Sequence, residues 1–222
     1  ILLGNPKPVD WLEKAVNLKW VQLYSTGFEY YSHIKLPALI TNMQDYYSQP
    51  CAETMIAGIM ALYRSMDKFS VLKANRQWVG YTMRAGVQLL NGKKVIILGW
   101  GNIGRRLAKM LSGFDCTLQV YARTAKEATM HTTEELEKQL PGADIVIGCL
   151  PGTGATAGLF TPKMIGLMKP TALFCNVGRG NLLQDEQALV DALNSGKLGG
   201  AVLDVTAQEP IPEDSPLWDC PN

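Results

Sequence analysis

Three short segments of the sequence combine residue types that can do chemistry. The first is Gly99-Trp100-Gly101-Asn102-Ile103-Gly104, the second runs from Asn176 to Gly180 around Arg179, and the third runs from Leu203 to Pro210 and contains Glu209. Glycines at the first spacing let a backbone turn, approach a pyrophosphate and pack a helix closely on a strand. An arginine can hold an anionic substrate, and a carboxylate can orient a proton donor.

The glycine segment is set between two elements that suit such a turn. An apolar run, Val95–Leu98, precedes it and is typical of a strand buried on both faces. Leu107, Ala108 and Leu111 follow at helical spacing. The new helix offers free N–H groups and the positive end of its dipole to phosphates. The setting indicates a dinucleotide site.

The next question is which dinucleotide binds. An NAD-selecting carboxylate is expected about 20 residues past the glycines, at the end of the second strand. Here Tyr121 is followed by Arg123, Thr124 and Lys126, with no carboxylate at the strand end. A guanidinium is well suited to a phosphate. We therefore predict NADP in preference to NAD; the alternative is a solvated basic turn.

Alternating strands and helices must position these segments. Apolar strands over 117–121, 144–150, 172–177 and 201–205 alternate with helical stretches over 133–140 and 185–194 and with a helix opened by Thr161-Pro162. This alternation predicts an α/β fold, a doubly wound parallel (Rossmann) sheet with right-handed crossovers. Its ligand loops, at the carboxyl ends of the strands, are 99–104, 122–126, 150–156, 176–180 and 204–209.

Residues 1–50 show a different pattern of expected strands and helices from the rest of the chain. Short strands are expected at 1–3, 20–24 and 39–41, with a weak helix around 9–18, which is too little for an independent domain. We predict a substrate-domain remnant at 1–49 and a dinucleotide-binding domain at 50–222. Within the second domain, 51–69 is expected as a helix and 70–90 as an arm. The arm forms either a subunit contact or a contact with its own domain.

Composition narrows the class of protein. The chain is 47% hydrophobic and 18% charged with a net charge of +1, which is typical of a globular protein and does not indicate nucleic-acid binding. No apolar run is long enough for a membrane helix. Five scattered cysteines and two distant histidines offer no metal-ligand cluster, and the cysteines indicate a reducing cytoplasmic location. The chain starts at Ile1, so a preceding targeting segment stays open.

The ordered set of motifs resembles one family. GWGNIG, NVGRG and LDVTAQEP followed by PLWDCPN are similar to the D-isomer-specific 2-hydroxyacid dehydrogenases, as are Cys51-Ala52-Glu53 and the segment 90–93. The basic residues after Tyr121 resemble the NADP-using glyoxylate and hydroxypyruvate reductases. The resemblance implies hydride transfer from NADPH to a small 2-ketoacid. It also implies a partial flavodoxin-like substrate domain and a homodimer formed through residues 51–90.

The same resemblance implies roles for individual residues. Arg179 binds substrate, Glu209 pairs with a catalytic histidine, and backbone N–H groups near Thr26 and Gly27 hold the substrate carboxylate. The cofactor is expected to contact residues from five loops: Gly99, Gly101, Asn102, Ile103, Gly104, Arg123, Thr124, Lys126, Leu150, Pro151, Thr156, Val177, Gly178 and Asp204.

The sequence also departs from the family pattern. The proton-donating histidine is expected after Asn222, and neither His33 nor His131 replaces it. In a 3-2-1-4-5-6 sheet, a sixth strand beyond residue 222 is expected to pair with 201–205. The front of the substrate domain is likewise expected ahead of Ile1. Two other hypotheses stay open: a dinucleotide-sensing corepressor-type binding protein and an inactive pseudoenzyme.

Overall fold

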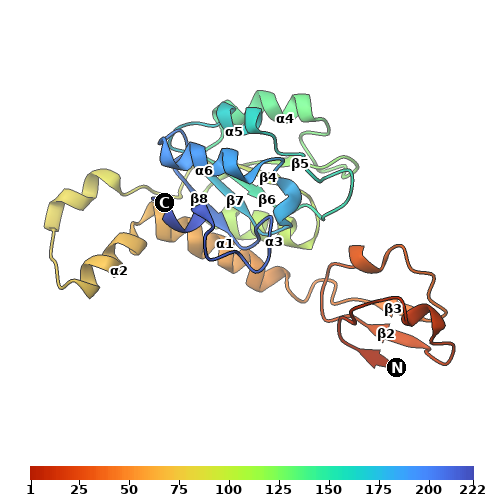
Figure 1. Ribbon diagram of the computed structural model, residues 1–222. Helices are drawn as coiled ribbons and strands as arrows, with labels where there is room; N and C mark the ends of the chain where they lie inside the picture. The colour runs from red at the N-terminus through yellow and green to blue at the C-terminus, as the bar shows by residue number, and fades with distance from the viewer. The chain divides into compact units, whose positions relative to one another are not determined.

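The computed structural model describes all residues from 1 to 222, and the chain divides into two compact units. The first unit is Ile1–Pro50 and the second is Cys51–Asn222. Figure 1 shows the first unit in red and orange and the second from orange to blue. The first unit has one buried apolar cluster and the second unit has two.

The first unit is a three-stranded parallel sheet in the order β1-β2-β3. Its strands are β1 (Leu2–Leu3), β2 (Trp20–Gln22) and β3 (Leu39–Thr41), and the 3-10 turns η1 (Leu12–Lys14) and η2 (Glu29–Tyr31) join them. The expected helix over 9–18 was wrong beyond η1. In η1, backbone N–H groups donate to carbonyls three residues earlier, as from Ala15 to Leu12 at 3.1 Å. This hydrogen-bond pattern gives a single tight turn.

The second unit contains a five-stranded sheet that is parallel throughout. Its strands are β4 (Lys94–Leu98), β5 (Thr117–Tyr121), β6 (Ile145–Gly148), β7 (Leu173–Asn176) and β8 (Gly200–Leu203). The crossover helices are α3 (Asn102–Leu111), α4 (Thr133–Gln139), α5 (Pro162–Leu167) and α6 (Glu186–Asn194). Short 3-10 turns add η4 (Ser112–Phe114), η5 (Leu140–Gly142), η6 (Gly180–Leu182) and η7 (Pro216–Asp219). This architecture confirms the predicted Rossmann-type α/β fold.

The strand order corrects one expectation about the sheet. The order is β5-β4-β6-β7-β8, and a single parallel bridge joins Tyr121 of β5 to Met130. That bridge occupies the third position of the 3-2-1-4-5-6 order, so β8 holds the sixth position. The sequence had assigned the sixth position to a strand after residue 222. The numbering was wrong because one residue pair leaves no apolar run to recognise. The pairing of 201–205 with a strand after residue 222 stays a prediction.

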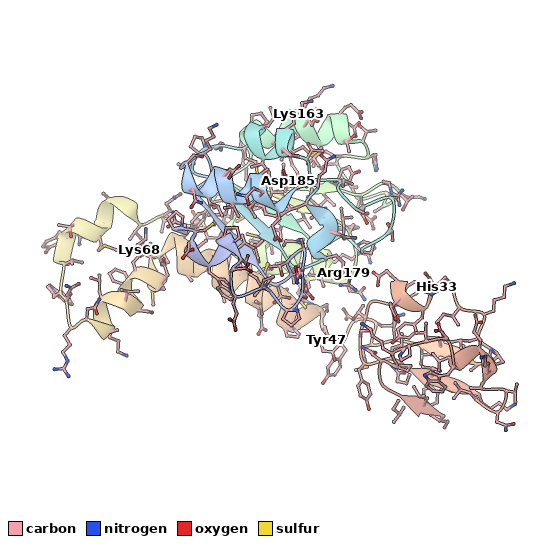
Figure 2. All side chains as sticks on the ribbon, viewed as in Figure 1. His33, Tyr47, Lys68, Lys163, Arg179 and Asp185 are labelled. Atoms are coloured by element: carbon pink, nitrogen blue, oxygen red, sulfur yellow. The ribbon has the colours of Figure 1, made fainter.

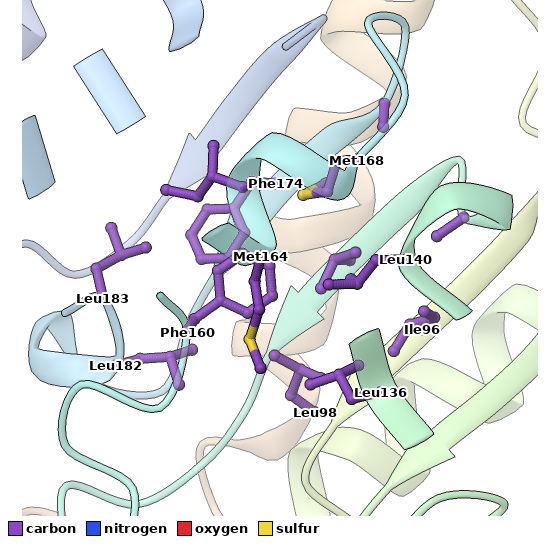
Figure 3. Close-up of a cluster of buried hydrophobic side chains, with 14 of the residues drawn as sticks. Ile96, Leu98, Leu136, Leu140, Phe160, Met164, Met168, Phe174, Leu182 and Leu183 are labelled. Atoms are coloured by element: carbon purple, nitrogen blue, oxygen red, sulfur yellow. The ribbon is translucent and has the colours of Figure 1, made fainter. Parts of the chain in front are cut away.

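The sheet separates two apolar layers because successive side chains in a strand point to opposite faces. Ile96 and Leu98 of β4 face a cluster formed with α4, α5 and α6, whereas Val95 and Ile97 face α1 and α3. Figure 1 shows these helices on the two sides of the sheet. Figure 3 shows the first cluster, in which the rings of Phe160 and Phe174 lie 4.9 Å apart. Packing on both faces holds the strands in place, and with them the loops that begin at the strand ends.

A long helical region precedes the sheet of the second unit. The expected helix over 51–69 is in fact two helices, α1 (Ser48–Tyr63) and α2 (Met66–Ala74), followed by η3 (Gly80–Gly86). Ser65 breaks the helix because its φ of 53° lies in the left-handed region. The arm after the break exposes Trp78 and Tyr81, which are 95% and 78% accessible. None of the helices combines the length and apolar character needed to cross a bilayer.

Candidate functional site

The three glycines after β4 meet three different constraints. Gly99 has a φ of +111°, and a Cβ there would lie 3.0 Å from the carbonyl oxygen of Cys149. A Cβ at Gly104 would collide with the carbonyl oxygen of Gly99, while a Cβ at Gly101 would meet no atom within 4 Å. Helix α3 begins at Asn102, next to this open space. The turn therefore leaves room at a helix N-terminus, as a pyrophosphate requires.

The turn after β5 displays the basic residues predicted to select the cofactor. Arg123, Thr124 and Lys126 are exposed, and the guanidinium of Arg123 partly offsets the burial that raises the pKa of Tyr121. The imidazole Nδ1 of His131 lies 2.8 Å from the carbonyl oxygen of Ala122, so it donates to that carbonyl. The exposed Glu127 shares the turn. The turn after β5 thus carries a guanidinium, an ammonium and an imidazole at exposed positions.

The acidic residues of the helix after this turn are engaged with backbone. Glu135 accepts hydrogen bonds from the N–H groups of His131 and Thr132 at 2.6 and 3.1 Å, and these bonds lower the pKa of its carboxyl. The hydroxyl of Thr132 accepts from the N–H of Glu135, which completes a capping box. This carboxylate therefore serves the start of α4.

The loop after β6 carries Leu150, Pro151 and Thr156. Leu150 is nearly buried, Pro151 is exposed, and Thr156 is 5% accessible. The hydroxyl of Thr156 donates to the carbonyl of Pro151 and accepts from the N–H of Thr153 at 2.9 Å. Its side chain thus closes the loop on itself, and its predicted contact with a cofactor stays a prediction.

The loop after β7 depends on a residue that the sequence reasoning did not single out. Asn176 is fully buried, donates from Nδ2 to the carbonyl of Arg179 at 2.9 Å and accepts at Oδ1 from the N–H of Gly178 at 3.1 Å. The guanidinium of Arg179 donates to the carbonyl of Gly178 at 2.7 Å. Figure 2 labels Arg179. A polar residue ending an apolar strand was the available signal for Asn176.

Close backbone contacts join the loops after β6, β7 and β8. A Cβ at Gly178 would lie 2.5 Å from the carbonyl oxygen of Leu150, and a Cβ at Gly180 would collide with the carbonyl oxygen of Thr206. The carboxylate of Glu209 accepts from the N–H of Thr206 at 3.2 Å. Through these contacts the loops that carry Arg179 and Glu209 become neighbours at the carboxyl ends of parallel strands.

Asp204 begins the loop after β8 and is exposed, and its N–H donates to the carbonyl of Asn176 at 2.9 Å. Burial raises the pKa of the nearby Cys51 thiol, and the carboxylate of Asp204 adds to that rise. Burial also raises the pKa of Cys149, beside the glycine turn. Both thiols are therefore held in the protonated, weakly nucleophilic form.

Thr26 and Gly27 lie in the first unit, in the loop after β2. The hydroxyl of Thr26 donates to the carbonyl of Gln44 at 3.3 Å, and the N–H groups of Thr26 and Gly27 have no acceptor within the protein. His33, labelled in Figure 2, also belongs to the first unit. Its ring lies 6.4 Å from that of Tyr30 in an edge-on arrangement.

The second unit therefore gathers all the predicted cofactor residues on five loops, with Arg179 and Glu209 on two of them. The first unit carries the remaining two predicted substrate residues.

Comparison with known proteins assigns the chain to a family. Residues 56–222 match the model of the D-isomer-specific 2-hydroxyacid dehydrogenase NAD-binding domain. A glyoxylate/hydroxypyruvate reductase B of Citrobacter koseri is 34% identical over all of this chain and 71% of its own length. A probable 2-ketogluconate reductase of Dictyostelium discoideum is 32% identical over 97% of this chain and 68% of its own length.

Solved structures agree with this result. A D-isomer-specific 2-hydroxyacid dehydrogenase family protein of Aeromonas salmonicida superposes over the whole chain and 72% of its own length, with a TM-score of 0.86 and 32% identity. An NADPH-dependent glyoxylate/hydroxypyruvate reductase of Sinorhizobium meliloti, solved with NADP and malonate, gives a TM-score of 0.78 at 25% identity over 97% of this chain and 71% of its own length. The chain therefore belongs to the D-isomer-specific 2-hydroxyacid dehydrogenases, with the family's NAD-binding domain at residues 56–222.

Proposed function

We propose that the chain belongs to an NADPH-dependent reductase that converts a small 2-ketoacid, such as glyoxylate or hydroxypyruvate, to a D-2-hydroxyacid. The observation that carries the proposal is the end of β5, where Arg123 and Lys126 stand in the place of a ribose-binding carboxylate. The NADP-bound reductase of Sinorhizobium meliloti supports the choice of cofactor. The reductases named for glyoxylate and hydroxypyruvate support the substrate class.

The residues present fit this dinucleotide. The open space at Gly101 and the N-terminus of α3 would receive the pyrophosphate. Arg123, Thr124 and Lys126 would bind the 2′-phosphate, with His131 beside them. The loops after β6 and β7 and Asp204 would line the nicotinamide half. Bound NADPH supplies a hydride to the keto carbon of the substrate.

The chain's own residues would bind and polarise the substrate. Arg179 would hold the carboxylate and draw electron density toward the keto oxygen, which gains negative charge as the hydride arrives. Backbone N–H groups of Thr26 and Gly27 would bind the carboxylate oxygens. Glu209 would orient and charge-stabilise the group that donates a proton to the keto oxygen. We assign that role to neither His33 nor His131, whose rings contact Tyr30 and the carbonyl of Ala122 instead.

Two further features belong to this proposal. The exposed aromatic arm supports a homodimer formed through residues 51–90. The five free cysteines support a reducing, cytoplasmic location. We assign residues 1–49 to substrate binding and 50–222 to the cofactor.

The test replaces the two basic residues at the end of β5. Arg123→Asp with Lys126→Ala should weaken NADPH binding while NADH binding is retained or improved. Binding is measured by nicotinamide fluorescence. Arg76→Asp with Lys68→Ala on the exposed arm makes the same change in net charge and serves as the control. If NADPH affinity does not fall relative to NADH affinity, the assignment of the cofactor is wrong.

A further inference from the structure

The turn after β2 leaves a run of backbone donors unused. The N–H groups of residues 25–28 have no acceptor within the protein. Thr26 and Phe28 are exposed, and Ser25 and Gly27 are half-buried. Successive N–H groups in a turn form a concave site for an anion when the carbonyls between them point away. The orientation of those carbonyls therefore decides whether this turn can bind a carboxylate.

Two side chains hold the carbonyls of the turn. Asn42 donates from Nδ2 to the carbonyl of Thr26 at 2.6 Å, and the hydroxyl of Ser25 donates to the carbonyl of Gly27 at 2.7 Å. Both carbonyl oxygens are thereby held by hydrogen bonds within the first unit. A rotated peptide would have to give up one of these hydrogen bonds.

Asn42 is itself fixed by the loop after β3. Its Oδ1 accepts from the N–H of Gln44 at 3.2 Å, and Gln44 has a φ of 44°, in the left-handed region. The N–H of Met43 donates to the carbonyl of Ser25 at 3.1 Å. The amide of Asn42 thus connects two loops at the carboxyl ends of neighbouring parallel strands.

The other side of the turn is tied to the rest of the first unit. The N–H of Tyr24 donates to Oδ1 of Asn5 at 3.0 Å, and the hydroxyl of Tyr47 donates to the carbonyl of Tyr24 at 2.9 Å. With both ends held, the four free N–H groups are presented by a braced turn.

The turn adjoins a cleft of about 450 Å³. The cleft has no acidic residue in its lining, which consists of Phe28, Tyr31, Ile40, Thr41, Asn42 and Gln44. An anion bound at the turn would therefore meet no like charge from the lining. Phe28 and Asn42 belong both to the braced region and to the cleft.

We propose that Asn42 and Ser25 are positioning residues that hold the turn at 25–28 in the conformation that binds the carboxylate of a 2-ketoacid. The inference rests on the proposed function and adds the residues that prepare the site. Asn42 acts through the carbonyl of Thr26, and Ser25 acts through the carbonyl of Gly27. Neither side chain needs to contact the substrate.

The test is an NMR titration of the chain, saturated with NADPH, with oxamate, an unreactive analogue of a 2-ketoacid. Oxamate should shift the amide signals of residues 25–28. Asn42→Asp, which keeps the acceptor for Gln44 and loses the donor for Thr26, should weaken oxamate binding about tenfold. Ser25→Ala should weaken it to a similar extent, and Ser25→Thr should restore it. Binding of NADPH should be unchanged in all three variants.

Asn17→Asp is the matched control, because it makes the same charge change at an exposed position of the same unit. Unshifted amide signals from β1, β2 and β3 show that each variant keeps its fold. If oxamate shifts no amide of residues 25–28 in the unsubstituted chain, the assignment of the substrate carboxylate in the proposed function fails. If oxamate shifts them and binds both Asn42→Asp and Ser25→Ala as tightly as the unsubstituted chain, the positioning role is wrong.

Discussion

Asn176 and Arg179 are joined by a hydrogen bond of 2.9 Å from the buried amide of the asparagine to the carbonyl of the arginine. The same amide accepts from the N–H of Gly178, so one side chain fixes the peptide groups before and after the catalytic candidate. The arginine side chain can then act from a loop whose backbone is not free to rotate. In the first unit, the side chain of Asn42 likewise donates to a backbone carbonyl of a ligand loop, that of Thr26.

Asn176→Ala should therefore cost both stability and function. Loss of two hydrogen bonds and a cavity at a fully buried position should lower the free energy of unfolding by about 2–3 kcal/mol. Urea unfolding followed by circular dichroism measures this loss. Asn194→Ala, at an exposed helix end, should change it by less than about 0.5 kcal/mol. Equal stability of the two variants would show that Asn176 does not brace the loop.

The three glycines of the first loop should respond differently to the same substitution. Gly101→Ala should keep the melting temperature and weaken NADPH binding, because the added methyl group fills only the space assigned to the pyrophosphate. Gly104→Ala should lower the melting temperature, because its methyl group would collide with the carbonyl of Gly99. Gly113→Ala, which meets no atom within 4 Å, is the control for both. Unaltered NADPH binding by Gly101→Ala would place the pyrophosphate elsewhere.

The carboxylate of Asp144 should contribute to the free energy of unfolding, and this contribution should be lost in acid. Burial opposes ionisation, yet the hydrogen bonds from Lys169 at 2.8 Å and from the N–H of Lys94 at 2.9 Å lower its pKa below the ordinary value. A lowered pKa stabilises the fold above the unfolded value of about 4, and this contribution is lost as the pH falls through the folded pKa.

Asp144→Asn should consequently lower the free energy of unfolding by about 1–2 kcal/mol at pH 7 and by clearly less in acid, near pH 3. Urea unfolding at both pH values measures the difference. Asp214→Asn, which removes an exposed carboxylate from the same unit, is the control. A loss of the same size at both pH values would contradict the assigned ionisation.

The aromatic arm should hold two copies of the chain together. Trp78→Asp places a charge in an interface that the proposal requires to be apolar, so light scattering should show a shift from dimer to monomer. Leu39→Asp, which charges an exposed apolar position of the first unit, is the control and should leave the dimer intact. If the unsubstituted chain is a monomer at micromolar concentration, the predicted homodimer is wrong.

Local signals in the sequence predicted the elements of the second unit well. The buried strand at Val95–Leu98, the helices expected over 133–140 and 185–194 and the helix start at Thr161 were recognisable, because these signals depend on a few neighbouring residues. The break at Ser65 was missed, since Met55, Ile59, Leu62 and Met66 keep the helical spacing across it. The bridge at Met130 was missed because a single pair has no periodicity.

Some features of the candidate site could likewise be predicted from the sequence, and others could not. Glycine spacing and the missing carboxylate after Tyr121 could be read from the sequence, because each depends on neighbours in the chain. The bonds that Asn176 makes within its loop, and the bond that Asn42 makes to Thr26 of another loop, required the folded backbone. Positions such as these fix the shape of a ligand loop without belonging to a motif.

The rate of turnover tests whether residues 1–222 contain the proton donor. General acid catalysis contributes about 10²–10⁴-fold to such reactions. Residues 1–222 alone should therefore reduce glyoxylate or hydroxypyruvate only at a trace rate, measured as loss of NADPH absorbance. His131→Ala should leave that trace rate unchanged. A rate typical of an enzyme, abolished in His131→Ala or His33→Ala, would identify the donor within the chain.

The most direct test of the central claim is a calorimetric titration of the purified chain with NADPH and, separately, with NADH. NADPH should bind at least about tenfold more tightly than NADH, because its 2′-phosphate adds charge-assisted bonds to Arg123 and Lys126. Equal affinities, or tighter binding of NADH, would contradict it.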